Sequence, residues 1–446
     1  MKKPQKYLEI SIEHLGEKGD GIALTTEGQI FVPMTLPGEK ARIRLETSTN
    51  SGKKIDLLEI IEKSKDRIAP HCKYFGACGG CVIQHLSVGP YLQWKRAIIE
   101  KALNNKRIFS NFIQPTIPTH SNGRRRTELT AIKTKTNSNK LSFGYSERSS
   151  HNIINIIECP ILSPTLNRVI QPLKIVIEKI LEPGSSWKIM LTETAVGIDM
   201  LISTKNNPKP HHLSGLSNFA INHDLARISW KSKNKRTEPI YQERVPTIDF
   251  DGISVVLPPG SFLQTSVQSQ RIMTSLVFEY TGEITAHKKV ADLFSGLGTF
   301  TLPLAKRGAQ VHSIDISGET LENLLAASGM AGFSGRVTTE KRNLMKYPLS
   351  PAELAFYEIV IFDPPRAGAE ALAKNLAISK VPIIIAVSCN PKTFARDADI
   401  LISGGYEMAD VTPLDQFVFS NQIELLARFQ YKQPGKHRMN NHPVRS

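Results

Sequence analysis

From residue 288 onward, short apolar runs alternate with amphipathic stretches, and this order constrains the fold more than any other feature of the 446-residue chain. The apolar runs predict strands at 290–294, 311–314, 359–362, 383–387 and 423–429, with helices between them, the first at 300–307. Such alternation predicts an α/β fold with a doubly wound parallel sheet, in which ligands bind at the carboxyl ends of the strands.

A glycine-containing turn follows the first of these strands, in the run Asp292-Leu293-Phe294-Ser295-Gly296-Leu297-Gly298-Thr299. Its glycines allow the backbone to approach a ligand closely, and the next helix offers free amides at its N-terminus. Asp315, at the end of the second strand, can accept both hydroxyls of a ribose. The turn lacks the third glycine of a dinucleotide site, which favours S-adenosylmethionine over NAD. The alternative is a plain glycine turn beside a surface acid.

A second motif, Asp363-Pro364-Pro365-Arg366, follows a later strand. The prolines hold the chain extended beyond the strand, so Asp363 is presented into the crevice, unless it only caps a turn. Methyltransferases that act on exocyclic amines carry a similar Pro-Pro followed by an aromatic residue. Here that position is Arg366, which argues against this class of substrate.

A third motif, Ser388-Cys389-Asn390-Pro391, lies where a strand ends and a helix begins. The amides and dipole of a helix N-terminus stabilise a thiolate, which is the reactive form of cysteine. The sequence therefore predicts Cys389 as a nucleophile, with a buried structural cysteine as the alternative.

Three of the five cysteines, Cys72, Cys78 and Cys81, lie close together in the chain, and Cys159 stands apart from them. Four thiolates can hold zinc or a 4Fe–4S cluster. Three ligands in one glycine-containing loop and a fourth from a distance favour the cluster, because paired CxxC knuckles would be typical of zinc. The spacing differs from that of radical S-adenosylmethionine enzymes. Four cysteines with no ligand role are the alternative.

Short apolar runs separated by glycine turns over the first 60 residues predict a small β-barrel of the OB type, a fold that often binds single-stranded nucleic acid. Lysine and arginine total 56 against 41 acidic residues, and the net charge of +15 favours a polyanionic partner such as a nucleic acid, unless the protein is merely basic. Arg124, Arg125 and Arg126 would either bind phosphates and stack on bases of a nucleic acid or form a solvated face.

We expect four regions: a barrel at 1–63, a central β domain that bears the cluster at 64–262, an α/β domain at 263–431 and a basic tail at 432–446. Amphipathic helices are expected at 91–103 and 166–181, and the basic spans 205–210 and 231–236 are expected as loops. No apolar run reaches the roughly 18 residues that a membrane span requires. No signal peptide is readable, so we expect a cytoplasmic protein, and we expect a monomer.

Taken together, these motifs resemble the RNA uracil-5 methyltransferases over residues 7–430. The resemblance is carried by the cysteine loop with Cys159-Pro160, the 262–264 segment, the glycine turn, the Asp363 and Cys389 motifs, and Glu424. Within this family the chain is similar to the branch with an N-terminal TRAM domain and an iron–sulfur cluster, which methylates a uridine of 23S ribosomal RNA.

The resemblance implies a TRAM barrel, a central β-rich iron–sulfur domain and a Rossmann-like class I methyltransferase domain, with the helix at 91–105 packed on the catalytic domain. The implied contacts to S-adenosylmethionine are Gln264, Phe294, Thr299, Asp315, Asn343 and Asp363. The implied cluster ligands are Cys72, Cys78, Cys81 and Cys159. The family often carries Asn, Glu, Asn and His where this chain has Thr299, Asp315, Ser266 and Gln422.

The resemblance also implies a covalent mechanism, in which Cys389 adds to carbon 6 of uracil and Glu424 later removes the proton from carbon 5. Transfer RNA is an alternative substrate. An RNA-binding or assembly factor that no longer turns over is a further alternative, although such a protein would need neither Cys389 nor Glu424.

Overall fold

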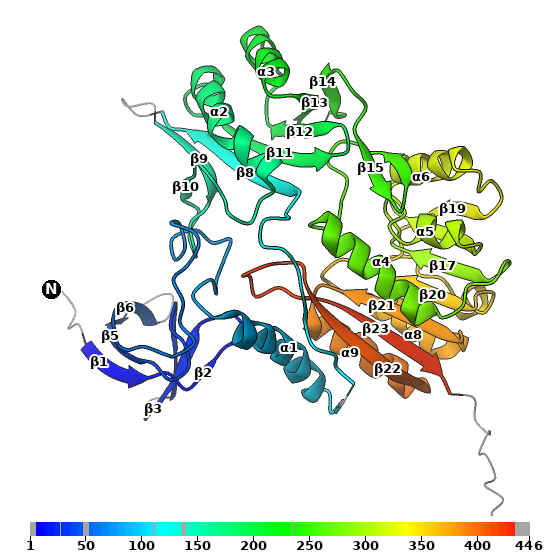
Figure 1. The fold of residues 1–446 in the computed structure, drawn as a ribbon, viewed down its shortest axis with the longest axis horizontal. Helices are drawn as coiled ribbons and strands as arrows, with labels where there is room; N and C mark the ends of the chain where they lie inside the picture. Colours follow the sequence, from blue (N-terminus) through cyan, green and yellow to red (C-terminus); the bar gives the residue numbers. More distant parts are fainter. Residues whose placement is uncertain are drawn as a thin grey trace, which may run out of the picture.

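Three regions make up the computed structural model, which describes residues 6–26, 28–47, 53–109, 112–135, 140–233 and 235–432 (Figure 1). A small β unit at the N-terminus lies below a central α/β region, and a larger α/β region lies beside both. The expected basic tail lies outside the described residues, except for Lys432.

The N-terminal unit consists of two three-stranded antiparallel sheets around a shared core. One sheet has the order β1 (Lys6–Ser11), β5 (Lys40–Thr47) and β6 (Lys53–Glu62), and the other has the order β2 (His14–Leu15), β3 (Gly21–Thr25) and β4 (Gly28–Val32). Alternating residues point inward, as expected for strands with one solvated face. They form a core of Ile10, Ile12, Ala23, Ile30, Val32, Ala41, Ile43 and Leu45.

The central region is a seven-stranded sheet with two helices packed on one face. Its strand order is β10 (Ile153–Asn155), β9 (Leu141–Ser146), β8 (Arg126–Lys133), β11 (Ser186–Thr194), β12 (Gly197–Thr204), β13 (Leu225–Ser232) and β14 (Glu238–Gln242). The helices are α2 (Pro164–Ile180) and α3 (Pro210–Asn222), which contact each other.

The sequence analysis missed α3. Serine, glycine and asparagine interrupt its apolar period, so packing rather than intrinsic propensity stabilises it. Gly215 allows the close approach, because a Cβ atom there would lie 2.9 Å from Ile180 Cγ2 of α2.

The third region contains an eight-stranded sheet. Its order is β19 (Val337–Lys341), β18 (Gln310–Asp315), β17 (Lys289–Leu293), β20 (Ile359–Phe362), β21 (Ile383–Ser388), β23 (Glu424–Tyr431), β22 (Tyr406–Asp415) and β7 (Ile117–Pro118). The five strands from β19 to β21 are parallel, whereas β23 runs antiparallel to both of its neighbours. The expected sheet is thus present, with one reversed strand.

Helices cover both faces of this sheet. On one face, α4 (Val267–Thr281), α5 (Thr301–Lys306) and α6 (Gly318–Met330) contribute to one apolar cluster. On the other face, α7 (Pro351–Leu354), α8 (Glu370–Ser379) and α9 (Pro391–Ser403) contribute to another. The helix α1 (Val88–Asn104) packs on α9 and β22 within that second cluster.

Both α1 and β7 precede the central region in the chain, so the third region is built from two separated segments. Its C-terminal segment starts after the hairpin of β15 (Thr247–Phe250) and β16 (Ile253–Val256), which packs against α6. β7, of two residues, carries no readable strand pattern, and its pairing with β22 is long-range.

Candidate active site

The strand ends bring the predicted functional residues to one edge of the sheet. Phe294, Asp315, Asp363 and Cys389 lie at or directly after the ends of β17, β18, β20 and β21, which are neighbouring parallel strands. Because β23 is antiparallel to β21, its first residue, Glu424, lies at the same edge. The strand order also reverses between β17 and β20, and ligands of doubly wound sheets bind at such a reversal.

The glycine turn after β17 orients Asp315. The amide of Gly296 donates to Asp315 Oδ2 (3.0 Å), and the amide of Ser317 donates to Asp315 Oδ1 (2.8 Å). Phe294 has φ +62°, a left-handed conformation that is rare for a bulky residue and is typical of functional sites. Gly298 (φ +89°) allows close packing, because a Cβ atom there would lie 2.6 Å from a methyl of Leu324.

The other predicted cofactor contacts differ in what they touch. Gln264 Nε2 donates to Asp363 Oδ2 (3.2 Å). Asn343 Oδ1 accepts from the amides of Met345 (3.1 Å) and Lys346 (3.2 Å), so in this structure its oxygen stabilises its own turn after β19. Thr299 is half-buried in the turn that precedes α5.

Several buried polar atoms at this edge have no hydrogen-bond partner among the described residues. They are Gln264 Oε1, Asp292 Oδ1 and Ser295 Oγ. Buried polar groups are rarely left unpaired, so a ligand at this site would supply the missing partners. Burial raises the pKa of both Asp292 and Asp363 to about 7, and a cationic ligand would favour their ionised forms. The residues therefore fit a polar, positively charged cofactor.

Cys389 lines a cavity of about 220 Å³. The third region contributes Arg366 and Lys392 to its lining, and the N-terminal unit contributes Glu17 and Lys18. Glu17 forms ion pairs with Lys392 (3.0 Å) and with Lys101 of α1 (3.1 Å). The N-terminal unit thus forms part of the wall around the candidate nucleophile, which the sequence analysis did not predict.

The predicted stabilisation of the Cys389 thiolate is wrong for the protein without ligands. Burial, followed by the carboxyl groups of Glu424 and Asp363, raises the pKa of Cys389 to about 11, and Arg366 opposes this shift only in part. The N-terminus of α9 is also occupied, since the Asn390 side chain accepts from the amide of Lys392 (3.1 Å). Cys389 is therefore a neutral thiol near neutral pH.

Glu424 is buried and held by a neighbour that the sequence analysis did not identify. Gln416 Nε2 donates to Glu424 Oε2, and Gln416 Oε1 accepts from the hydroxyl of Thr265 (3.3 Å). Burial and the charge of Asp363 raise the pKa of Glu424 well above its usual range. No local pattern marks Gln416, because its position depends on how β23 returns along β22.

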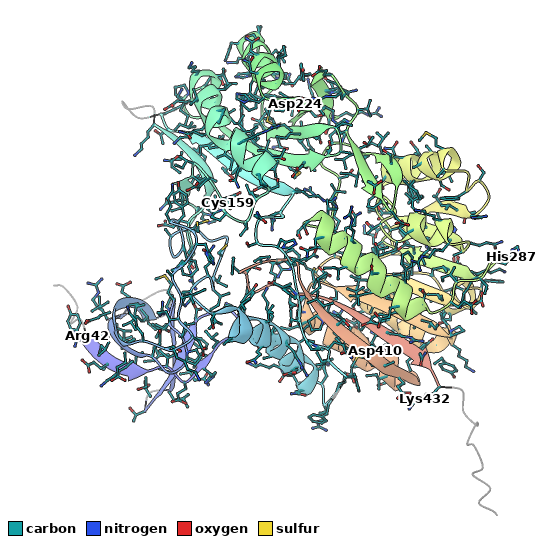
Figure 2. All side chains as sticks on the ribbon, in the orientation of Figure 1. Arg42, Cys159, Asp224, His287, Asp410 and Lys432 are labelled. Atoms are coloured by element: carbon teal, nitrogen blue, oxygen red, sulfur yellow. The ribbon has the colours of Figure 1, made fainter. Side chains whose placement is uncertain are left out.

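The four clustered cysteines lie where the N-terminal unit meets the central region, and Figure 2 shows Cys159 at the lower side of the central region. The loop that carries Cys72, Cys78 and Cys81 is held to β9 by the amide of Gly79, which donates to Ser146 O (3.0 Å). Each thiol lies close enough to the other three for their charges to interact.

The sulfur atoms of these four thiols are widely spaced. Burial, followed by the other thiols, raises the pKa of Cys81 to about 12, so the free Cys81 thiol is neutral and a metal would have to displace its proton. Within the described part of this region, no three Cys, His, Asp or Glu ligand atoms lie within 4.8 Å of one another. A tetrahedral zinc ion with bonds of about 2.3 Å would hold its sulfur ligands about 3.8 Å apart.

Comparison with known proteins identifies the chain. Residues 335–428 match the family model described as tRNA (Uracil-5-)-methyltransferase, and residues 2–51 match the TRAM domain. A protein named uncharacterized RNA methyltransferase from Brucella suis is 37% identical over 422 residues, which cover 94% of this chain and 97% of that protein. The chain belongs to the RNA uracil-5-methyltransferases. The predicted enzyme class and the predicted TRAM domain are confirmed.

Two further relatives of this methyltransferase carry more specific names. The 23S rRNA (uracil(1939)-C(5))-methyltransferase of Tolumonas auensis is 29% identical, and the match covers 96% of this chain and 97% of that protein. The crystal structure of the Pyrococcus abyssi tRNA (uracil-54, C5)-methyltransferase, in complex with S-adenosyl-L-homocysteine, superposes with a TM-score of 0.70 at 25% identity. That match covers 95% of this chain and all of the solved one. The predicted methyltransferase fold is thereby supported. No helix among the described residues of the methyltransferase is long and apolar enough to cross a membrane.

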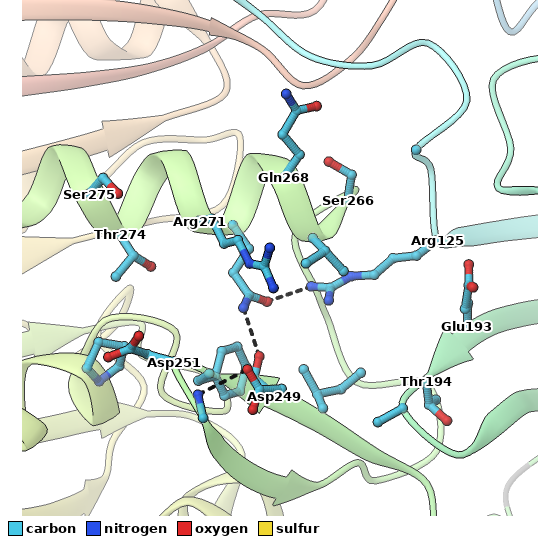
Figure 3. Close-up of a pocket in the computed structure, with 18 of the residues that line it drawn as sticks. Arg125, Glu193, Thr194, Asp249, Asp251, Ser266, Gln268, Arg271, Thr274 and Ser275 are labelled. Atoms are coloured by element: carbon cyan, nitrogen blue, oxygen red, sulfur yellow. Dashed lines mark hydrogen bonds between the residues drawn. The ribbon is translucent and has the colours of Figure 1, made fainter.

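Two residues of the arginine run of the methyltransferase, Arg125 and Arg126, do not form the exposed contact to RNA that was considered for the run. Arg125 is buried, donates to Gln264 O (3.2 Å) and to Gln270 Oε1 (2.8 Å), and lines a cavity of about 720 Å³ between α4 and the β15–β16 hairpin (Figure 3). Arg126 donates to Gly260 O (3.1 Å). These two side chains therefore join the central region to the segment before α4.

The pKa of Cys389 gives the methyltransferase a testable pH dependence. We expect alkylation of Cys389 in the RNA-free protein to accelerate about tenfold per pH unit between about pH 7 and pH 9, because the thiolate fraction of a thiol with a pKa near 11 still rises tenfold per unit there. Mass spectrometry of the Cys389 peptide measures the rate. The Glu424→Gln variant should shift the curve to lower pH. A plateau near pH 8.5, the ordinary thiol pKa of about 8.5, would contradict the expectation.

Proposed function

We propose that this methyltransferase transfers a methyl group to carbon 5 of a uridine in 23S ribosomal RNA, with Cys389 as nucleophile and Glu424 as base. The observation that carries the proposal is that Cys389 and Glu424 lie at the same sheet edge as Asp315 and Asp363. A thiol and a buried carboxyl group beside a cofactor site are what the chemistry of carbon 5 requires, because this carbon is too weak a nucleophile to take a methyl group unaided.

In this mechanism Cys389 loses its proton to solvent and its sulfur adds to carbon 6, which leaves a negative charge delocalised over carbon 5 and oxygen 4. When bound, S-adenosylmethionine supplies the methyl group that carbon 5 then takes. Glu424, once its own carboxyl proton has been lost to solvent, removes the carbon 5 proton as a carboxylate. The electron pair reforms the ring double bond, and the Cys389 sulfur leaves as a thiolate. The raised pKa of Glu424 makes its carboxylate a stronger base than an exposed one.

The residues proposed to hold S-adenosylmethionine are Gln264, Phe294, Thr299, Asp315, Asn343 and Asp363. Asp315 is oriented by two backbone amides, as a residue that binds ribose hydroxyls needs to be. The buried carboxyl of Asp363 would favour a cationic sulfonium nearby.

We also propose that Cys72, Cys78, Cys81 and Cys159 bind a 4Fe–4S cluster with a structural role. Their mutual proximity and wide sulfur spacing support this assignment. The cluster would join the cysteine loop to the central region, because Cys159 follows β10 whereas the other three ligands precede α1.

Mapping 5-methyluridine in ribosomal and transfer RNA of a deletion strain tests this function. We expect one 5-methyluridine to disappear from 23S ribosomal RNA, and a plasmid with the wild-type gene to restore it. The 29% identical relative favours 23S ribosomal RNA, whereas the family model's name and the Pyrococcus abyssi structure favour transfer RNA. Loss from transfer RNA alone would establish that second substrate. Unchanged 5-methyluridine in both RNAs would indicate the binding or assembly factor instead.

A further inference from the structure

The loop at 416–423, between β22 and β23, determines much of the geometry of the active site. It begins with Gln416, which donates to Glu424, and it ends directly before Glu424 itself. Asn421 and Gln422 of this loop line the cavity of Cys389. A shift of the loop would therefore move the base relative to the nucleophile.

This loop contains a strained residue at its tip. Phe419 has φ +59°, a left-handed conformation that is disfavoured for an aromatic residue. Such a conformation persists only where surrounding contacts impose it. Two neighbouring elements provide these contacts: α1 and the segment directly after Cys81.

The first contact is Tyr91 of α1. Its hydroxyl donates to Asp415 Oδ2 (2.5 Å) and accepts from the amide of Phe419 (2.8 Å). The rings of Tyr91 and Phe419 also lie against each other, with centroids 5.7 Å apart. One hydroxyl thus joins the end of β22 to the tip of the loop.

The second contact is Lys95, one helical turn after Tyr91 and fully buried. Its ammonium group lies 2.9 Å from Asp415 Oδ1, and it donates to Phe417 O (3.2 Å) and to Gln422 O. Because these carbonyls lie on the two sides of the tip, a single buried cation holds both sides of the loop. A lysine in the apolar stripe of an amphipathic helix was the only sequence signal for this role.

The segment after Cys81 holds the tip from the other side. The amides of Val82 (2.8 Å) and Ile83 (3.3 Å) both donate to Phe419 O. The backbone of Phe419 is therefore fixed at its amide by α1 and at its carbonyl by the cysteine loop.

We propose that Tyr91 and Lys95 are positioning residues for the base: through Asp415 and the 416–423 loop they hold Glu424 where it can take the proton from carbon 5. This inference rests on the proposed function and extends it to residues that touch neither substrate nor cofactor. Loss of these contacts should slow the step that uses Glu424 and spare the step that uses Cys389.

The test is Tyr91→Phe in the full-length protein, with Tyr406→Phe as the matched control. Tyr406 is equally buried and donates to Leu376 O (3.2 Å), but it lies at the opposite end of β22. Single-turnover reactions with substrate RNA, followed on denaturing gels, separate formation of the protein–RNA adduct from its release. We expect Tyr91→Phe to slow release about tenfold or more, since small misplacements of a catalytic group cost up to about a hundredfold, with adduct formation nearly unchanged. Tyr406→Phe should change neither rate.

A second variant tests the same role in case Tyr91→Phe does not fold. Lys95→Met combined with Asp415→Asn removes the ion pair without leaving a lone buried charge, which would be the destabilising outcome of a single replacement. It keeps a hydrogen-bond partner for Tyr91 but releases Phe417 O and Gln422 O, so it should slow adduct release in the same way.

The outcomes separate the two proposals. Glu424→Gln serves as the reference that accumulates adduct. If this reference accumulates adduct while the folded α1 variants release it at the wild-type rate, or slow formation and release equally, the positioning role is wrong. If Glu424→Gln forms no adduct at all, the proposed base itself is wrong, and the positioning role fails with it.

Discussion

Replacement of Cys389 by alanine is expected to abolish methylation, with no covalent protein–RNA adduct at any time. Without the thiol, nothing adds to carbon 6, and carbon 5 never becomes nucleophilic enough to take a methyl group. Replacement of Glu424 by glutamine is expected to have the opposite signature: the RNA is methylated once and the adduct then accumulates, because loss of a general base slows its step by roughly 10²–10⁴-fold.

Denaturing gels with labelled RNA and mass spectrometry of the digested RNA distinguish these results. Glu407→Gln is a matched control, because Glu407 is an exposed carboxylate on the far end of the same sheet, paired with Lys432 (3.1 Å). It should behave like the wild-type protein. Substantial 5-methyluridine formation by Cys389→Ala would exclude the covalent mechanism.

The second large effect is expected at the cysteine loop. Protein purified without oxygen should contain iron and sulfide and show a broad visible absorption, and Cys81→Ser should lose them. The free energy of unfolding should fall in parallel, because metal binding contributes folding energy where ligands come from distant segments. Increased protease cleavage between residues 63 and 87 would show that the loss of stability is centred on the cysteine loop.

Cys389→Ser is the control, since Cys389 is the fifth cysteine and lies outside this group of thiols. This variant should keep its iron and its stability while losing activity. One zinc and no iron in the anaerobic wild-type protein would contradict the cluster assignment. Equal stability of Cys81→Ser and the wild-type protein would contradict its structural role.

Much of the candidate site could be predicted from sequence because it depends on short-range order. Asp363 and Cys389 each follow a buried apolar run, and the ends of parallel strands must meet at one edge. What could not be predicted depends on long-range contacts. Gln416 and Lys95 contact partners that are brought together only by the fold. Arg125 is expected at the surface from sequence, because its buried partners are known only from the structure.

The protonation state of Cys389 illustrates the same limit. Its position at the start of a helix suggests a thiolate, since helix dipoles favour negative charge at that end. The tertiary structure brings two carboxyl groups and apolar burial to the same sulfur, and their combined effect is larger. Local position therefore places Cys389 at the sheet edge, but it does not predict the protonation state of its thiol in the protein without ligands.

The split construction of the catalytic fold also sets an order of events during synthesis. Ile99 and Leu103 of α1 pack in one apolar cluster with Phe394 and Leu401 of α9. Because a ribosome delivers the chain from its N-terminus, α1 emerges before the central region, and α9 emerges close to the end. The apolar face of α1 therefore stays without its partner α9 while the intervening regions fold. The nascent chain therefore cannot form the cavity of Cys389 until translation is nearly complete. Fragments that end before α9 would leave the apolar face of α1 exposed to aggregation and would lack this cavity.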